Sequence, residues 1–405
     1  MIDHTGRPLG GVEKLYFALD HIASKDFALV AGLDKKIPEE KMPEALVLLT
    51  GLHPQLNYRI VADNSEQLWF SSERHAPVPH QVFQIEDDQD WISFAERTMT
   101  SGIDPYSSPL FRITLLQKRE RSVLVALINH SIADGLSGLI VLQDLLRIIS
   151  GERPLSFPVP LSMDEALQLV PKNPESVFLP GKAPLMSSIR KKQPSVKVSK
   201  IRFNAEITSK LISRSKTEGT TVTGILYAAI AFAMKGTDDR FINGKIGTRV
   251  PVSVRNELKS GKNVVLNVIT KTMMLDIFSD SNIWDLARQV SIELGALNTV
   301  GQISGYVSYF RKEMLRHAKF SEIVTKMKAT IGTDLMLSNL GNLTDQSYGD
   351  FKILELWGPL VISGTGTEQT IGAVTIGGEL TLTQVSSAPI PALLEETMEL
   401  LLANL

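Results

Sequence analysis

The spacing of apolar residues predicts that helices and strands are mixed along the whole chain. Short apolar runs indicate strands, and apolar residues that recur every three or four positions indicate helices. Before residue 150 the pattern predicts a helix within 9–22, helices at 38–51, 91–98 and 135–149, and strands at 27–32, 56–61, 68–70, 111–117 and 123–128. After residue 199 it predicts strands at 200–203, 245–254, 264–275, 335–340, 352–356, 361–362, 371–376 and 379–385, and helices at 207–218, 223–234, 284–296, within 308–329 and at 391–402.

Prolines mark the middle of the chain. Eight of them lie between residues 151 and 199, in a stretch with one short helical pattern near 163–169. Because proline interrupts regular structure, we predict a crossover linker there. The predicted organisation is an N-terminal subdomain of residues 1–150, the linker 151–199 and a C-terminal subdomain of residues 200–405. Each subdomain is expected to be α/β with a mixed sheet, and a cleft between them is the default place for a site.

Composition narrows the function. The 405 residues carry a formal net charge of −2, and the basic run Arg190–Lys192 is short, so we expect no nucleic-acid partner. Cysteine is absent, which excludes a thiol nucleophile. No third ligand is spaced with His75 and His80, which are predicted to lie in a proline-bearing loop, so no metal is expected. No secretion signal or membrane span is indicated, and the expected location is the cytoplasm.

The most informative segment is the predicted turn between strand 123–128 and helix 135–149. It contains His130, Asp134 and Gly135. An imidazole at a strand end, with an ordinary pKa of about 6.5, is able to take a proton at neutral pH and is a candidate general base. A plainer interpretation is that Asp134 caps the helix and that His130 is an ordinary strand-end residue.

Several segments together resemble one family. The HxxxDG signature of the chloramphenicol acetyltransferase-like superfamily is similar to the segment His130-Ser131-Ile132-Ala133-Asp134-Gly135. This superfamily includes condensation domains, polyketide-associated acyltransferases and alcohol acetyltransferases. Further similar segments follow in the family's order: Asp104–Tyr106 with Pro109–Arg112, Thr220–Gly224, Pro251-Val252 with Arg255, Leu266-Asn267, and Leu337–Gly341. The free-standing acyltransferases of this superfamily, and not a domain of a large synthetase, are favoured by Arg7–Gly10 together with Glu13.

The resemblance implies two similar subdomains arranged in a V with a tunnel between them. It implies that His130 is the general base and that Asp134 pairs with Arg255 instead of orienting the imidazole. Gly135 fits a place where small size or positive φ is needed. Ser338 and Asn339 are candidate oxyanion donors, although a turn chosen for its geometry alone is the plainer explanation of this segment.

The same resemblance implies the reaction and its participants. The donor would be an acyl thioester of coenzyme A or of the phosphopantetheine arm of an acyl or peptidyl carrier protein, and no cofactor would be bound permanently. The acceptor would be a small-molecule alcohol or amine, as in secondary metabolism, and the protein is expected to be a monomer.

Three alternatives stay open at this point. One is a carrier-dependent, amide-forming condensation enzyme. Another is an inactive binding module, because Asn129 stands where many members have a first histidine. The third is thioester hydrolysis. Ser137 does not complete a GxSxG nucleophile elbow, since the glycines around it are one residue too close.

Overall fold

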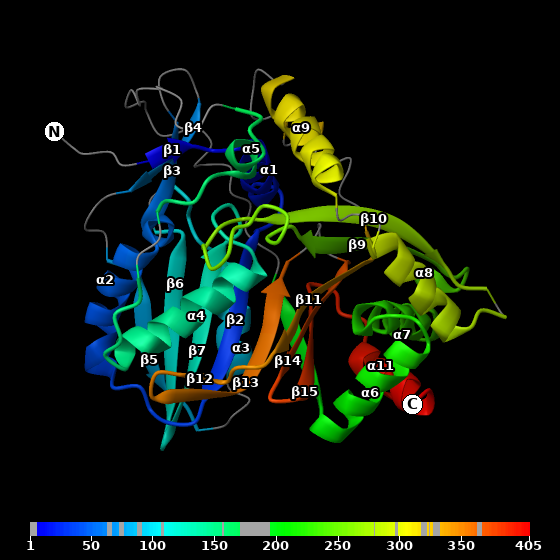
Figure 1. Ribbon diagram of the computed structural model, residues 1–405. Helices are drawn as coiled ribbons and strands as arrows, with labels where there is room; N and C mark the ends of the chain where they lie inside the picture. Colours follow the sequence, from blue (N-terminus) through cyan, green and yellow to red (C-terminus); the bar gives the residue numbers. More distant parts are fainter. Residues whose placement is uncertain are drawn as a thin grey trace.

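The structure is a computed structural model that describes residues 6–62, 67–72, 77–86, 91–106, 109–155, 158–170, 195–278, 280–295, 299–316, 322–323, 325–326, 333–362 and 367–405. Two six-stranded mixed sheets stand side by side, each with helices packed against it (Figure 1). A third sheet of three strands lies near the end of the first one, in the order β1 (Gly6–Pro8), β4 (Leu68–Ser72) and β3 (Tyr58–Ala62).

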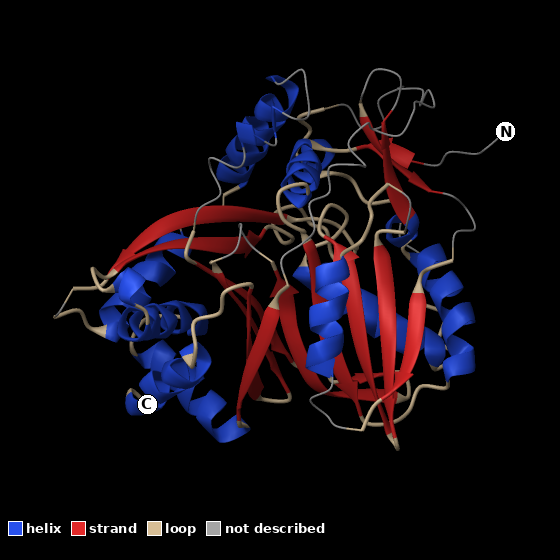
Figure 2. Cartoon of the chain, turned by 180° about the vertical axis from the view of Figure 1, so that it is seen from behind, coloured by secondary structure: helices blue, strands red, loops and turns tan. Residues whose placement is uncertain are grey.

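The first large sheet is covered on both faces. Its strand order is β12 (Ser347–Tyr348), β13 (Phe351–Val361), β2 (Asp26–Leu33), β7 (Arg121–Asn129), β6 (Phe111–Lys118) and β5 (His80–Gln84). Helix α4 (Gly135–Ile149) packs on one face, with α2 (Met42–Leu52) beside it, and α3 (Trp91–Ser101) packs on the other (Figures 1 and 2). Because both faces are covered, β2 and β7 are apolar without alternation and are buried almost throughout.

The second large sheet carries a helical layer on its outer face. Its order is β10 (Val268–Asp276), β9 (Lys245–Ser253), β11 (Leu335–Leu343), β14 (Gln369–Ile376), β15 (Glu379–Ser386) and β8 (Lys197–Phe203). The helices of this layer are α6 (Ala205–Thr217), α7 (Val222–Thr237), α8 (Ile283–Gly295) and α11 (Leu393–Ala403). As its sequence predicts, α7 is buried over most of its surface.

Helices α1 and α9 connect the two halves beyond the sheets. Helix α1 (Gly11–Asp20) is in the N-terminal half, and α9 (Val300–Arg316) packs against it from the C-terminal half. The short helix α5 (Met163–Ala166) lies in the predicted linker and also contacts α9. Linker residues 171–194 lie outside the described residues, as does His75. In the described part of the chain, no helix is both long and apolar enough to cross a membrane.

Strand β13 joins the halves most directly. It comes late in the chain, yet it pairs antiparallel with β2, and Trp357 stands opposite Val30. It also packs on β14 and β15, where the Thr381 hydroxyl donates a hydrogen bond to the Leu356 carbonyl at 2.8 Å. Residues 347–361, which sequence assigns to the C-terminal subdomain, therefore belong to the first sheet.

The structure corrects several predicted elements. His80 is not in a loop but begins β5, which pairs parallel with β6 at the sheet edge. Strand β10 begins at Val268 instead of Val264, because residues 264–267 bond to side chains of the N-terminal half. The predicted strands 352–356 and 361–362 are one strand, β13, with irregular pairing. Helix α9 begins at Val300, eight residues before the predicted start at 308.

Candidate active site

A cavity of about 90 Å³ lies where the two halves of the molecule meet. Both halves supply its walls. The lining includes Tyr16, Phe27 and His130 from the N-terminal half and Arg249, Tyr306 and Ser338 from the C-terminal half. The cavity is smaller than the roughly 300–1,000 Å³ of pockets that enclose whole drug-sized ligands. It is therefore large enough for the reacting ends of substrates, not for complete substrates.

His130 reaches this cavity from the end of β7. Its backbone N–H donates to the Lys25 carbonyl at 3.0 Å, which ties the strand end to the segment that leads into β2. Its ring contacts two aromatic rings, with centroid distances of 4.6 Å to Tyr16 and 5.0 Å to Phe27. Its Nδ1 is buried and has no hydrogen-bond partner in the described part of the chain. Among the described residues, no carboxylate therefore bonds to Nδ1, and the ring packs against these two aromatic side chains.

The surroundings of His130 favour a neutral ring. Burial lowers the pKa of His130 to about 4, and Lys25 adds to this effect. The Asp134 carboxylate and the backbone carbonyls of His130 and Ala133 oppose the lowering without cancelling it. At neutral pH the imidazole is therefore unprotonated and able to accept a proton. Negative charge that develops in the cavity during a reaction would raise this pKa and strengthen the base.

Asp134 combines the two roles that the sequence left as alternatives. It caps α4, since its Oδ1 accepts the Ser137 N–H at 2.8 Å. The same oxygen lies 2.9 Å from Arg255 Nη2, and Oδ2 accepts the Asn267 N–H at 3.0 Å. Both members of the ion pair are buried, with 4% of Asp134 and 7% of Arg255 exposed. Asp134 thus joins the signature turn to the C-terminal half.

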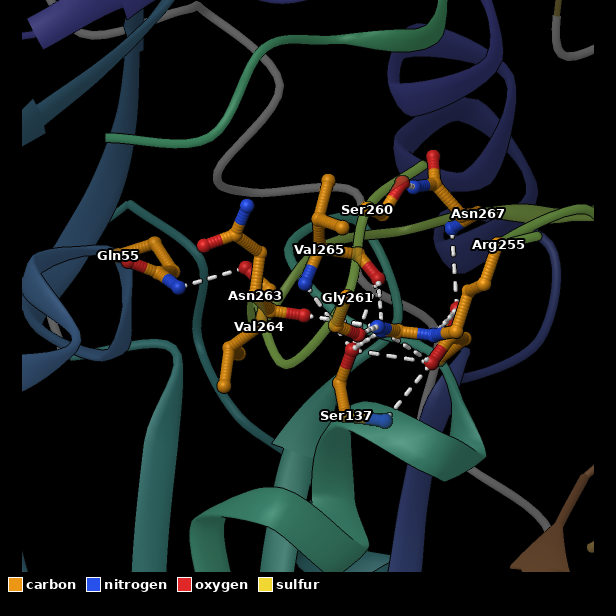
Figure 3. Close-up of polar contacts among 10 residues, drawn as sticks. Gln55, Ser137, Arg255, Ser260, Gly261, Asn263, Val264, Val265 and Asn267 are labelled. Atoms are coloured by element: carbon orange, nitrogen blue, oxygen red, sulfur yellow. Dashed lines mark hydrogen bonds and ion pairs between the residues drawn. The ribbon is translucent and has the colours of Figure 1, made fainter. Parts of the chain in front are cut away.

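Arg255 extends this connection over a whole loop. Its guanidinium donates to the carbonyls of Gly261 at 3.3 Å, Asn263 at 2.8 Å and Val265 at 3.1 Å (Figure 3). From the other side of the same loop, the Val264 carbonyl accepts from Gln55 at 2.6 Å. The loop that precedes β10 is therefore bonded to the N-terminal half at several points.

Ser137 contributes to the same network and was not predicted to. Its hydroxyl donates to the Val265 carbonyl at 2.8 Å and accepts from the Val265 N–H at 3.0 Å (Figure 3). Arg255 also donates to it. Sequence reasoning considered Ser137 only as a nucleophile. Its position three residues after an N-capping aspartate, on the buried face of α4, was the available signal.

Asn129 and Gly135 have structural explanations. The Asn129 amide donates to Asp26 at 2.9 Å and accepts from the Ser131 hydroxyl at 2.6 Å, so it braces the end of β7. Gly135 lines the cavity without a positive φ. A Cβ there would lie 2.7 Å from Leu340 Cδ2, so small size is the relevant property.

The two candidate oxyanion donors lie on opposite sides of β11. Ser338 lines the cavity. Asn339 does not: its amide donates to Thr223 at 3.1 Å and accepts the Gly341 N–H at 2.8 Å. Neighbouring residues of a strand point to opposite faces, so the two were not able to share one site. We therefore retain Ser338 as a candidate and withdraw Asn339.

Five cavity-lining polar residues were missed by sequence reasoning: Tyr16, Lys25, Arg249, Thr270 and Tyr306. They come from α1, the segment before β2, β9, β10 and α9, which meet only in the folded chain. Thr270 on β10 holds the Tyr306 hydroxyl at 3.2 Å. No local motif marked any of them.

Comparisons with known proteins agree with the fold. Residues 25–158, which include His130 and Asp134, match the sequence model of the Condensation domain family. A search of the curated proteins finds no match. Among solved structures, polyketide synthase associated protein 5 from Mycobacterium tuberculosis matches with a TM-score of 0.68 and 15% identity over 98% of this chain and 97% of its own.

Two further structures are similar over nearly the whole chain. The trichothecene 15-O-acetyltransferase TRI3 from Fusarium sporotrichioides has a TM-score of 0.67 and 13% identity, covering 98% of this chain and 94% of its own. The first condensation domain of the CDA synthetase has a TM-score of 0.68 and 12% identity, covering 98% and 95%. The chain has the fold of the chloramphenicol acetyltransferase-like superfamily. The match to the condensation model also supports acyl transfer or condensation as the general class of reaction.

Proposed function

We propose that this protein transfers an acyl group from a thioester to an alcohol or amine, with His130 as the general base. The observation that carries this proposal is the neutral imidazole of His130 on a cavity that both halves of the molecule line. A site at a junction of two halves allows two substrates to approach one reacting centre from different sides.

Each step of the proposed reaction is assigned to a chemical group of the protein or of a substrate. The acceptor's O–H or N–H hydrogen bonds to His130, which takes the proton as oxygen or nitrogen attacks the thioester carbonyl carbon. The tetrahedral intermediate then collapses, the carbon–sulfur bond breaks, and the imidazolium returns its proton to the thiolate. The Ser338 hydroxyl, which lines the same cavity, is the candidate donor to the oxyanion.

A mostly apolar, water-poor site suits this chemistry. Phe27, Val268 and Met336 are buried residues of the cavity wall. Excluding water strengthens hydrogen bonds to the developing charge and suppresses hydrolysis of the thioester. The Asp134–Arg255 pair would act indirectly, by holding the signature turn against the C-terminal half.

A second candidate is amide formation with a carrier-bound substrate. The match of residues 25–158 to the Condensation domain family favours it. It would use the same base and the same cavity, and it differs in the donor's attachment and in the acceptor atom. Coenzyme A and a carrier protein supplied in trans are equally open as donors.

The proposal is tested by measuring thiol release from acyl-coenzyme A and from an acyl-loaded carrier protein, with and without a mixture of alcohols and amines. We expect release to depend on the acceptor and an ester or amide to appear by mass spectrometry. Release without an acceptor would indicate a hydrolase. No release from either donor with any acceptor, by folded protein, would contradict the proposal.

A further inference from the structure

Two cationic side chains lie on the cavity wall beside His130. Lys25 comes from the segment before β2, and Arg249 comes from β9. The β9 residues Arg249 and Pro251 are two positions apart and point to the same face of the strand, and both line the cavity. The neighbour of Arg249 on β11 is Met336, an apolar residue of the same wall.

The two cations differ in how their charge is balanced. Lys25 donates to the Ile362 carbonyl at 3.2 Å. Burial and the charge of Arg249 lower the pKa of Lys25 to about 8, and the Asp20 and Glu368 carboxylates oppose this lowering. The Arg249 side chain has no ion pair and no hydrogen bond among the described residues, although its backbone carbonyl accepts from the Tyr227 hydroxyl. Its Nε is buried and unsatisfied. Among the described residues of the cavity wall, Arg249 is thus the cation whose side chain has neither an ion pair nor a hydrogen bond, whereas Lys25 has a carbonyl partner.

The Arg249 guanidinium is partly buried and has no ion pair among the described residues. Charged groups in protein interiors are normally paired, because loss of hydration is otherwise uncompensated. Lys25 adds a second positive charge nearby, and the charge of Arg249 contributes to the lowered pKa of Lys25. Hydroxyl groups of the same cavity wall, among them those of Tyr16 and Tyr306, are able to donate to an anion. An anion bound in the cavity would compensate the positive charges of Arg249 and Lys25.

We propose that Arg249 binds a carboxylate carried by the small molecule that reacts at His130, with Lys25 adding to the attraction. This inference rests on the proposed function and specifies its substrate class. The planar guanidinium binds a carboxylate through two parallel hydrogen bonds. The carboxylate belongs either to the acyl group or to the acceptor. The phosphates of coenzyme A or of a carrier arm are excluded, because the pantetheine chain separates them from the thioester.

Binding measurements test this without requiring turnover. For the donor, calorimetry compares glutaryl-coenzyme A with valeryl-coenzyme A, which has the same number of acyl carbons and no carboxylate. For the acceptor, it compares 3-hydroxybutyrate with its uncharged amide. The protein variants are Arg249→Met, Arg249→Lys and the control Lys245→Met. Lys245 is an exposed cation on the same strand.

We expect one acid to bind more tightly than its uncharged partner. Arg249→Met should weaken the binding of that acid by roughly 10–100-fold, the usual range for a hydrogen bond to a charged group. The affinity for the uncharged partner should stay unchanged. Arg249→Lys should restore part of the affinity, and Lys245→Met should have no effect. The pair that shows the preference identifies which substrate carries the carboxylate.

Two outcomes would overturn the inference. One is that neither acid binds better than its uncharged partner. The other is that Arg249→Met weakens charged and uncharged ligands equally, or lowers turnover of every donor equally, as expected for a group that stabilises only the oxyanion. Failure of the proposed function would appear differently, as absence of acyl transfer by protein that still discriminates between the ligands.

Discussion

At the scale of single residues, the most consequential property is the low pKa of His130. The ring accepts a proton only while it is neutral, and burial lowers its pKa to about 4. We predict that kcat/KM for acyl transfer falls as the pH drops through about 4, and not through the 6.5 of an unperturbed histidine. A rate profile in constant-ionic-strength buffers measures this, and an acid limb centred above pH 6 would be inconsistent with a buried base.

The same pKa predicts how stability depends on pH. Because the folded protein holds His130 below its unfolded pKa, the unfolded chain binds more protons between about pH 4 and 6.5. The contribution of His130 to stability is therefore complete above pH 6.5 and is lost as the pH falls toward 4. His130→Gln should flatten the decline in Tm over this window, whereas His80→Gln, at an exposed position, should not. Parallel curves for wild type and His130→Gln would contradict the burial of the ring.

The buried ion pair leads to a second residue-scale prediction. Asp134→Asn keeps a side chain that caps helices well but removes the charge opposite Arg255. Breaking such a pair typically costs about 3–5 kcal/mol, so we expect a lower Tm and reduced transfer activity. Glu206→Gln, which removes one partner of an exposed pair with Lys210, is the control and should change Tm little. An unchanged Tm in Asp134→Asn would refute a structural role for the pair.

Part of the candidate site could be predicted from the sequence. His130, Asp134 and Arg255 were predicted because they belong to recognisable local segments, and the structure places Asp134 beside Arg255. The positions of Arg249 and Tyr306 on the cavity wall were not predictable from the sequence, because the other residues of that wall are distant from them in the chain. Asn339 failed for a related reason: its proposed role required knowing which face of β11 it occupies.

At the scale of elements, helix α7 offers a matched pair of glycines. A Cβ on Gly224 would lie 2.6 Å from the Ala287 carbonyl of α8, whereas one on Gly236 would meet nothing within 4 Å. Gly224→Ala should force α7 and α8 apart and destabilise the protein by about 1–3 kcal/mol. Gly236→Ala should stabilise it by about 0.5–1 kcal/mol, since alanine is the better helix former. Urea unfolding of both variants measures this, and equal changes in the two would show that the α7–α8 contact is not tight.

Elements were predicted best where one strong pattern governs them. Helix α4 was predicted at its observed bounds, because Asp134 caps a regular apolar stripe. Strand β5 was missed, because it lies at a sheet edge and is mostly exposed, so it lacks the alternation that marks a strand. Strand β13 was predicted in two pieces, since Gly358 and Pro359 interrupt an apolar run that tertiary pairing with β2 keeps extended.

At the scale of the whole molecule, the two halves are connected in ways that also build the site. Strand β13 carries part of the C-terminal half into the first sheet, and its end supplies Pro359 and Val361 to the cavity wall. On the other side, Arg255 joins the loop before β10 to the signature turn. The base therefore lies on one half and the candidate oxyanion donor, Ser338, on the other, so the site exists only when the halves are in contact.

The central claim is that the imidazole at this junction removes the acceptor's proton. The most direct measurement is the single-turnover rate of acyl transfer by His130→Ala and His130→Gln, with Tm and thioester binding measured on the same preparations. The account predicts a rate lower by about 10²–10⁴-fold with binding retained, the range usual for a general base. A variant that folds, binds the thioester and transfers the acyl group at the wild-type rate would contradict it.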